Sequence, residues 1–298
     1  MKKYLLGLLL FLAAFTMFAQ DLALIFQAVP ANSTFLLGVN SAEFRKLPVY
    51  QKHIANSTLV KKMEKSFGPD MSSYAMFASP DPMSQKFYLI TETAQTQQKI
   101  LALIKNKTGQ DPKIVNYGGA KVYRCADGVE ISFPKKNLVV MSNTSLEPYF
   151  KEKKGLPAAL RAPFGKDPVS GVFSLPGEMR KSNPMLASME RIIFRIAVPE
   201  KSAASELDFS LDVACNSADG AKQTMMLMQQ LQLALGIFMN NTDPELAQDF
   251  NKSTEIKTNG TTVSMRLGVS EKMIRQLSLL ADPETLKALA GGGDSDFE

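Results

Sequence analysis

The residue types that carry much of enzyme and metal chemistry are scarce in this 298-residue chain, which has no tryptophan, one histidine and two cysteines. Zinc sites need several close ligands, and the chain has neither an H-E-x-x-H nor a C-x-x-C motif. His53, the only imidazole available as a catalytic base, stands among polar residues, so we expect it at a surface or a helix end. Walker, G-x-G-x-x-G and G-x-S-x-G motifs are also absent. We therefore expect no metal and no cofactor.

The overall composition is that of a folded soluble domain, with 45% hydrophobic and 21% charged residues. The formal net charge is only +5, without the clustered basic stripe of a nucleic-acid-binding protein. The densest basic stretch, residues 151–166, is interpreted as a solvated linker, and contact with anionic envelope polymers is the alternative. We expect no nucleic-acid partner.

Residues 1–19 have the pattern of a bacterial secretion signal. Lys2 and Lys3 precede an apolar run, and Ala19 is a small residue at the expected cleavage point. The apolar run is short for a helix that crosses about 30 Å of hydrocarbon. We expect cleavage before Gln20, export to the periplasm or beyond, and no integral span afterwards. An uncleaved N-terminal anchor is the alternative.

The rest of the chain reads as an internal duplication joined by a linker. The first half is expected over 20–150, the linker over 151–168, the second half over 169–290, and a flexible acidic tail over 291–298. Each half opens on a short apolar run with a Gly-Val step, and a basic helix follows. These openings are residues 34–48, with Gly38, and 168–184, with Gly171.

The same order of elements then follows in both halves. Paired apolar runs predict hairpins at 74–92 and 191–215, and helices are expected near 94–107 and 218–239. Further hairpins are predicted at 113–125 and 253–267, turning at Gly118-Gly119 and Asn259-Gly260. The first half inserts one more hairpin, 129–142, and a short helix closes each half. The class is therefore α+β: two similar antiparallel-sheet halves with helices packed on one face. Whether the two sheets join stays open.

The segments PANSTFLLGVNSAEFRKLP, KFYLITETAQTQQKILALI, VNYGGAKVYRCADG and NLVVMSNTSLEPYF carry a loose resemblance. Their order is similar to that in an uncharacterised group of exported bacterial proteins with domains of unknown function. The resemblance covers most of the chain after residue 19 and consists mainly of apolar spacing and glycines. It implies an envelope location, and it assigns no activity and no functional residues.

The expected helix at 218–239 is unusually apolar around its circumference. One stripe recurs at spacings of three and four residues: Ala221, Met225, Met228, Leu231, Leu235 and Phe238. A second row consists of Met226, Leu233 and Ile237, interrupted by Gln230. We interpret the helix as a core element between the two halves. The alternatives are a partner surface such as a homodimer contact, or a wall of an apolar ligand pocket, formed by Met226, Leu233 and Ile237.

Cys125 and Cys215 each occupy an apolar alternating position, which suits either a disulfide between the halves or two buried thiols. The function we expect is that of a non-catalytic binding or interaction protein of the envelope. Its partner would be a second copy or another envelope protein. A carrier of apolar or lipid ligands is one alternative. A hydrolase that uses paired carboxylates or a Ser-Lys pair is the other, because such groups need no histidine.

Overall fold

The computed structural model describes residues 22–55, 74–84, 86–93, 95–199 and 205–274. The expected signal at 1–19 and the acidic tail at 291–298 lie outside the described residues. So does the larger part of the closing helix expected after Ser270.

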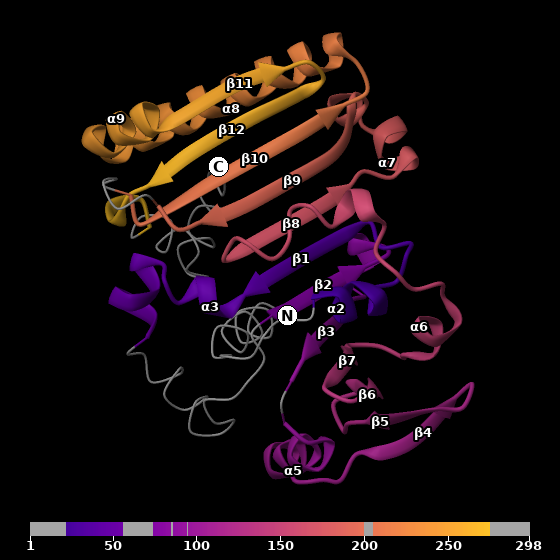
Figure 1. The fold of residues 1–298 in the computed structure, drawn as a ribbon. Helices are drawn as coiled ribbons and strands as arrows, with labels where there is room; N and C mark the ends of the chain where they lie inside the picture. Colours follow the sequence, from indigo (N-terminus) through magenta and orange to yellow (C-terminus); the bar gives the residue numbers. More distant parts are fainter. Residues whose placement is uncertain (1–21, 56–73, 85, 94, 200–204, 275–298) are drawn as a thin grey trace, which may run out of the picture.

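Twelve strands and seven α-helices make up the described structure (Figure 1). The strands are β1 Phe35–Asn40, β2 Tyr74–Ser79, β3 Tyr88–Glu92, β4 Lys113–Tyr117, β5 Ala120–Arg124, β6 Glu130–Lys135, β7 Leu138–Ser142, β8 Val169–Ser174, β9 Met189–Ala197, β10 Leu207–Cys215, β11 Thr254–Asn259 and β12 Thr262–Val269. The helices are α2 Leu22–Ala28, α3 Ser41–Phe44, α5 Gln97–Thr108, α6 Glu147–Lys151, α7 Gly177–Ser182, α8 Ala218–Thr242 and α9 Pro244–Ser253.

All twelve strands form one antiparallel sheet in the order β11-β12-β10-β9-β8-β1-β2-β3-β7-β6-β5-β4. The halves join directly, because β1 pairs with β8 from Phe35 opposite Phe173 to Val39 opposite Val169. The α+β class with a large antiparallel sheet is thus confirmed, and the two sheets are continuous.

Strand order runs outward from this central pair in the same way on both sides. β1 is followed by β2, β3, β7 and β6, and β8 by β9, β10, β12 and β11. The β6–β7 hairpin therefore takes the place that the β11–β12 hairpin has in the second half. The extra hairpin is β4–β5 at the sheet edge, whereas the sequence had suggested 129–142 as the insertion.

Glycine allows the tight turns that the sequence predicted. Gly118 and Gly119 link β4 to β5 with φ values of 57° and 87°, and Gly260 links β11 to β12 at 60°. These backbone angles are accessible to glycine at little cost. Both hairpin predictions are confirmed.

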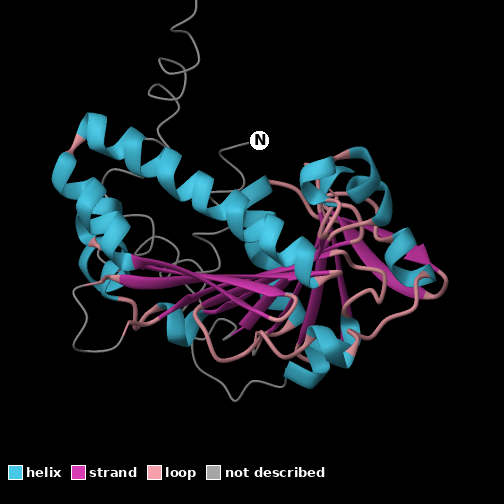
Figure 2. Ribbon diagram, turned by 90° about the horizontal axis from the view of Figure 1, so that it is seen from above, coloured by secondary structure: helices cyan, strands magenta, loops and turns pink. Residues whose placement is uncertain are grey.

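Helices cover both faces of the sheet, as Figure 2 shows from above, so the prediction that they pack on one face is wrong. α5, α8 and α9 share one face: Ile100 of α5 packs beside Val139, and Met228 of α8 packs beside Val213 and Val263. α2 and α6 lie on the other face, where Ile25 and Tyr149 join the largest core cluster. Alternation of side chains along each strand sends neighbouring residues to these two layers.

An aromatic ring covers a strand glycine in each half. A β-carbon at Gly38 of β1 would overlap the buried rings of Tyr74 and Phe164. One at Gly171 of β8 would overlap the ring of Phe194. Only a residue without a side chain leaves space for these rings, which explains the two glycines singled out in the sequence.

The segment expected as a linker packs against the first half. Leu156 and Phe164 are buried in the same core cluster as Ile25 of α2, and Lys154 forms an isolated bridge with Pro30. Residues 151–168 therefore contribute to the core on the way to β8.

Candidate functional site: the apolar surface of α8 and α9

Helix α8 is the longest described helix, and its N-terminal part is firmly attached to the sheet. Ser217 caps it, its side chain accepting a hydrogen bond of 3.0 Å from the backbone N–H of Gly220. Ala221, Thr224 and Met228 are buried against strands of the second half. This part of the helix is buried as predicted, but against the sheet of the second half and not between the two halves.

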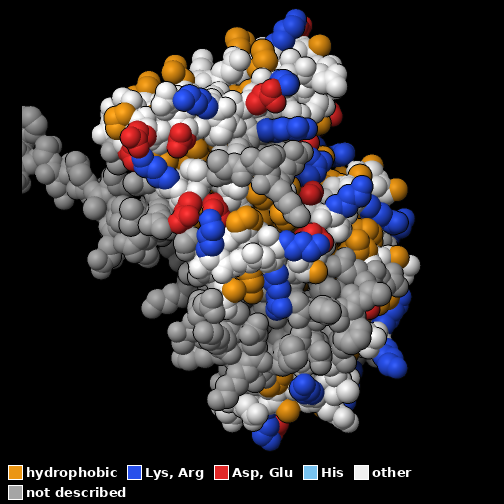
Figure 3. Space-filling model, turned by 60° about the vertical axis from the view of Figure 1, so that its left-hand side comes forward, with side chains coloured by type: hydrophobic (Ala, Val, Ile, Leu, Met, Phe, Trp, Pro, Cys, Tyr) orange, Lys and Arg blue, Asp and Glu red, His pale blue; other side chains and the backbone are white. Residues whose placement is uncertain are grey.

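Beyond Met228 the helix remains apolar, but its side chains reach solvent. Six large apolar residues of α8 are between 45% and 65% exposed: Met226, Leu231, Leu233, Leu235, Ile237 and Phe238. Figure 3 shows hydrophobic side chains at the surface in the upper part of the molecule, where α8 and α9 lie. The interpretation of the whole helix as a core element is therefore wrong for its C-terminal half.

The six residues divide between two sides of the helix. Leu231, Leu235 and Phe238 continue the side that Thr224 and Met228 bury against the sheet. Met226, Leu233 and Ile237 lie on the opposite, outer side, as 100° per residue requires. The three residues predicted as an interface or ligand wall thus form one exposed row, which we call the outer row.

Helix α9 turns back beside α8 and creates a shallow groove of about 580 Å³. Leu233, Gly236 and Ile237 form the α8 side, and Pro244 and Ala247 belong to the α9 side. Gly236 is buried because Asn251 of α9 lies directly against it. The sequence analysis missed α9, although Asp243 followed by Pro244 is a typical start of a helix.

An ion-pair cluster holds the corner between α8 and α9. Asp243 caps α9 by accepting from the N–H groups of Glu245 and Leu246, and the Lys272 ammonium lies 2.8 Å from its carboxylate. The hydrogen bond from Lys272 lowers the pKa of Asp243 below its ordinary value of 3.8. The corner is therefore stabilised at neutral pH, and this contribution is lost as the pH falls through that lowered pKa.

The α8 surface carries no charge along most of its length. Asp219 and Lys222 lie in the first two turns, and residues 223–242 contain no Asp, Glu, Lys or Arg. Amides surround the apolar side chains instead: Gln223, Gln229, Gln230, Gln232, Asn240 and Asn241. An exposed apolar patch with a polar rim is typical of an interaction surface.

The two cysteines lie in separate clusters and are free thiols. Cys125 packs with Ile131 and Val139, and Cys215 packs with Val213 and Ala221. The disulfide that the sequence allowed is therefore not formed in this structure. Burial raises the pKa of the Cys125 thiol to about 11 from an ordinary value of 9.0.

We expect Cys125 in the folded chain to react with iodoacetamide at pH 8 about 100-fold more slowly than in urea, because a raised pKa leaves little thiolate. The unfolded chain loses this proton first, so the contribution to stability declines as the pH rises from 9 to 11. Peptide mass spectrometry after timed labelling measures the rate at Cys125, and urea unfolding over this pH range measures the change in stability. Two adducts in urea without reductant are expected, whereas none would show that the cysteines form a disulfide.

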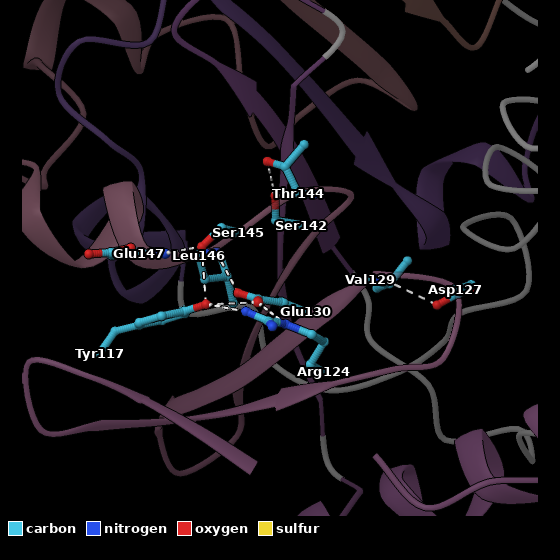
Figure 4. Close-up of polar contacts among 10 residues, drawn as sticks. All are labelled: Tyr117, Arg124, Asp127, Val129, Glu130, Ser142, Thr144, Ser145, Leu146 and Glu147. Carbon is cyan, nitrogen blue, oxygen red and sulfur yellow. Dashed lines mark hydrogen bonds and ion pairs between the residues drawn. The ribbon is translucent and has the colours of Figure 1, made fainter. Parts of the chain in front are cut away.

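A second polar constellation surrounds Glu130, whose side chain is 1% exposed (Figure 4). One carboxylate oxygen accepts from Arg124 Nε at 2.7 Å and from the Tyr117 hydroxyl at 2.9 Å. The other accepts from the Leu146 N–H at 2.6 Å, where α6 begins. The only signal for this site in the sequence is one acid between the apolar residues Val129 and Ile131. Because both oxygens are occupied, this carboxylate ties β4, β5 and α6 together.

Two acids on the same side of β10, Asp208 and Asp212, also have structural partners. Asp212 pairs with Arg195 at 2.8 Å and accepts from Ser264 at 2.7 Å, and Asp208 accepts from Ser205.

Among the described residues, no three His, Cys, Asp or Glu side chains gather as a metal site would require. No helix within the described ranges is long and apolar enough to span a membrane. His53 lies in the π-helical turn Tyr50–Ile54.

Comparison with known proteins defines the class of structure only. No family model matches the chain, and no curated protein matches it. Among solved structures, crystal form III of TP0453 superposes with a TM-score of 0.51 at 10% identity. The match covers 87% of this chain and 98% of that one. Crystal form I of the same protein gives 0.49 at 11% identity, covering 87% and 97%. This chain therefore has an α+β fold similar to that of TP0453.

Proposed function

We propose that the chain is an exported, non-catalytic binding protein of a bacterial envelope that engages its partner through α8. The observation that carries the proposal is the set of six apolar side chains, 45–65% exposed, on the part of α8 that has no charged residue, 223–242. Leaving that much apolar surface in water is unfavourable by about 25 cal/mol per Å², which a partner would recover. The secretion pattern of residues 1–19 supports export.

The α8–α9 groove favours a second candidate, a carrier of apolar ligands. Its apolar lining includes Leu233, Ile237 and Ala247, and its volume of about 580 Å³ lies within the usual range for small-molecule sites. A lipid chain bound there would contact residues of the outer row. The two candidates therefore share a surface and differ in what covers it.

The proposal is tested by placing a photo-crosslinking amino acid at position 233 in the producing cells. The matched control is position 114, because Ile114 is also an exposed apolar residue but lies on the edge strand β4. We expect adducts at position 233 to exceed those at 114 by at least about tenfold, the ratio that about 1.4 kcal/mol of preferential binding gives. Mass spectrometry assigns each adduct to a second copy, another protein or a phospholipid. Equal labelling at the two positions would refute the proposal.

A further inference from the structure

The outer row of α8 extends into a longer seam with coiled-coil spacing. Gln223, Met226, Gln230, Leu233, Ile237 and Asn240 follow one another at intervals of three, four, three, four and three residues. This is the repeat with which one helix packs along another. All six residues are exposed, so no described element of the chain occupies the seam.

The seam is complementary to itself in one orientation. Consider two α8 helices packed antiparallel about a two-fold axis between residues 231 and 232. Met226 then faces the partner's Ile237, Gln223 faces the partner's Asn240, and Gln230 faces the partner's Leu233. Apolar residues meet at two layers, and amides that both donate and accept hydrogen bonds meet at the ends.

Charge and surface chemistry also favour a second copy. When two copies of one surface pack together, charged residues near the two-fold axis repel each other. Residues 223–242 contain no charged residue, so this repulsion is absent. Helices that lie on a bilayer surface usually carry Lys or Arg on their polar face, which this stretch lacks. A helix with a glutamine and asparagine rim is better suited to another helix of the same kind.

We therefore propose that two copies of this chain pair through antiparallel α8 helices along the Gln223–Asn240 seam. This inference rests on the proposed function and names its partner. The seam spans about 26 Å, at 1.5 Å per residue. Such a contact buries roughly half of the 800 Å² per partner typical of a stable interface. We expect a reversible dimer that dissociates in the range of about 1–100 µM.

Sedimentation of the secreted chain over a concentration series measures this equilibrium. Ile237→Lys should weaken the dimer about 100-fold or more, because the substitution acts at both symmetry-related contacts. Ile114→Lys is the matched control, since Ile114 is 58% and Ile237 55% exposed, and it should leave the equilibrium unchanged. Circular dichroism confirms that each variant is folded. A wild-type chain that is monomeric throughout, or equal weakening by both substitutions, would overturn the proposal.

Two charge variants test the orientation. In the antiparallel pair, Gln223→Glu with Asn240→Glu places like charges opposite each other and should weaken the dimer at least about tenfold. Gln223→Lys with Asn240→Glu places opposite charges together at both ends and should pair at least as tightly as the wild type. In a parallel pair this second double variant would weaken the dimer, because the two lysines at position 223 would face each other. Weakening by both double variants therefore contradicts the antiparallel seam.

Failure of this inference is distinguishable from failure of the proposed function. If the purified chain is monomeric but position 233 crosslinks in cells to a phospholipid or another protein, self-pairing is refuted and the binding surface stands. Binding of the monomer to phosphatidylethanolamine and phosphatidylglycerol vesicles would identify the lipid case. If position 233 gives no more adducts than position 114, both are refuted.

Discussion

Replacing Glu130 with leucine is expected to lower the free energy of unfolding by about 3 kcal/mol. The carboxylate is almost fully buried and accepts three hydrogen bonds, from Arg124, Tyr117 and the Leu146 N–H (Figure 4). Leucine fills the space of the Glu130 side chain, but it leaves the buried Leu146 N–H without an acceptor. The Ser145 hydroxyl accepts from the next N–H, that of Glu147, so it does not replace Glu130 at Leu146. Urea unfolding followed by circular dichroism measures the change, because the chain has no tryptophan for fluorescence.

Two further variants separate the contributions at this site. Glu130→Gln keeps one carbonyl oxygen as an acceptor and should cost about half as much as Glu130→Leu. Arg124→Gln should cost less than Glu130→Leu, since the Arg124 side chain is half-exposed and its charge is hydrated. Equal losses for Arg124→Gln and Glu130→Leu would mean that the ion pair, and not the cap of α6, dominates.

Gly38→Ala is expected to destabilise the fold by about 2–3 kcal/mol. The new methyl group would overlap the Tyr74 and Phe164 rings, both of which are buried and cannot swing into solvent. Because β1 lies at the centre of the sheet, any shift there is transmitted to β2 and β8. The loss should appear as a lower midpoint in thermal and urea unfolding.

Two other glycines provide the comparison. Gly171→Ala should cost less than Gly38→Ala, because the Phe194 ring that it meets is only half-buried and can tilt outward. Gly177→Ala, at the start of α7, meets no atom within 4 Å and has no positive φ. It should be neutral or stabilising by up to about 1 kcal/mol. A loss at Gly177 as large as at Gly38 would contradict the steric explanation.

Local patterns were sufficient to predict most of the fold. The Gly118-Gly119 and Asn259-Gly260 steps located two hairpins. Gly118, Gly119 and Gly260 have positive φ values, which glycine adopts at little cost. The helix expected at 218–239 begins where α8 does, at Ala218, and the Ser217 side chain caps it. Joining of the two sheets was not predictable, since the pairing of β1 with β8 depends on contacts between residues at least 130 positions apart.

The candidate site was predictable only in part. Helical periodicity identified the row of Met226, Leu233 and Ile237, because spacing along a helix determines which residues share a side. It does not determine what covers that side, and the sequence analysis favoured burial between the halves. The outer row is exposed because α8 packs with its other side on the sheet of the second half. The groove beside the row depends on α9, which was not expected from the sequence. Glu130 was missed because its partners belong to three different elements: β4, β5 and the start of α6.

The order of strands has a consequence for how the chain assembles. Each half begins at the middle of the sheet, reaches an outer edge at β4 or β11 and then returns inward, and the two central strands come from residues 35–40 and 169–174. β1 consequently has an open edge until more than half of the chain is available to pair with it. An exposed edge strand of sequence FLLGVN is a template for pairing with other chains. The two halves therefore share an order of strands, but each needs the other to fold. β1 is made first of the twelve strands, and its open edge is paired with β8 late.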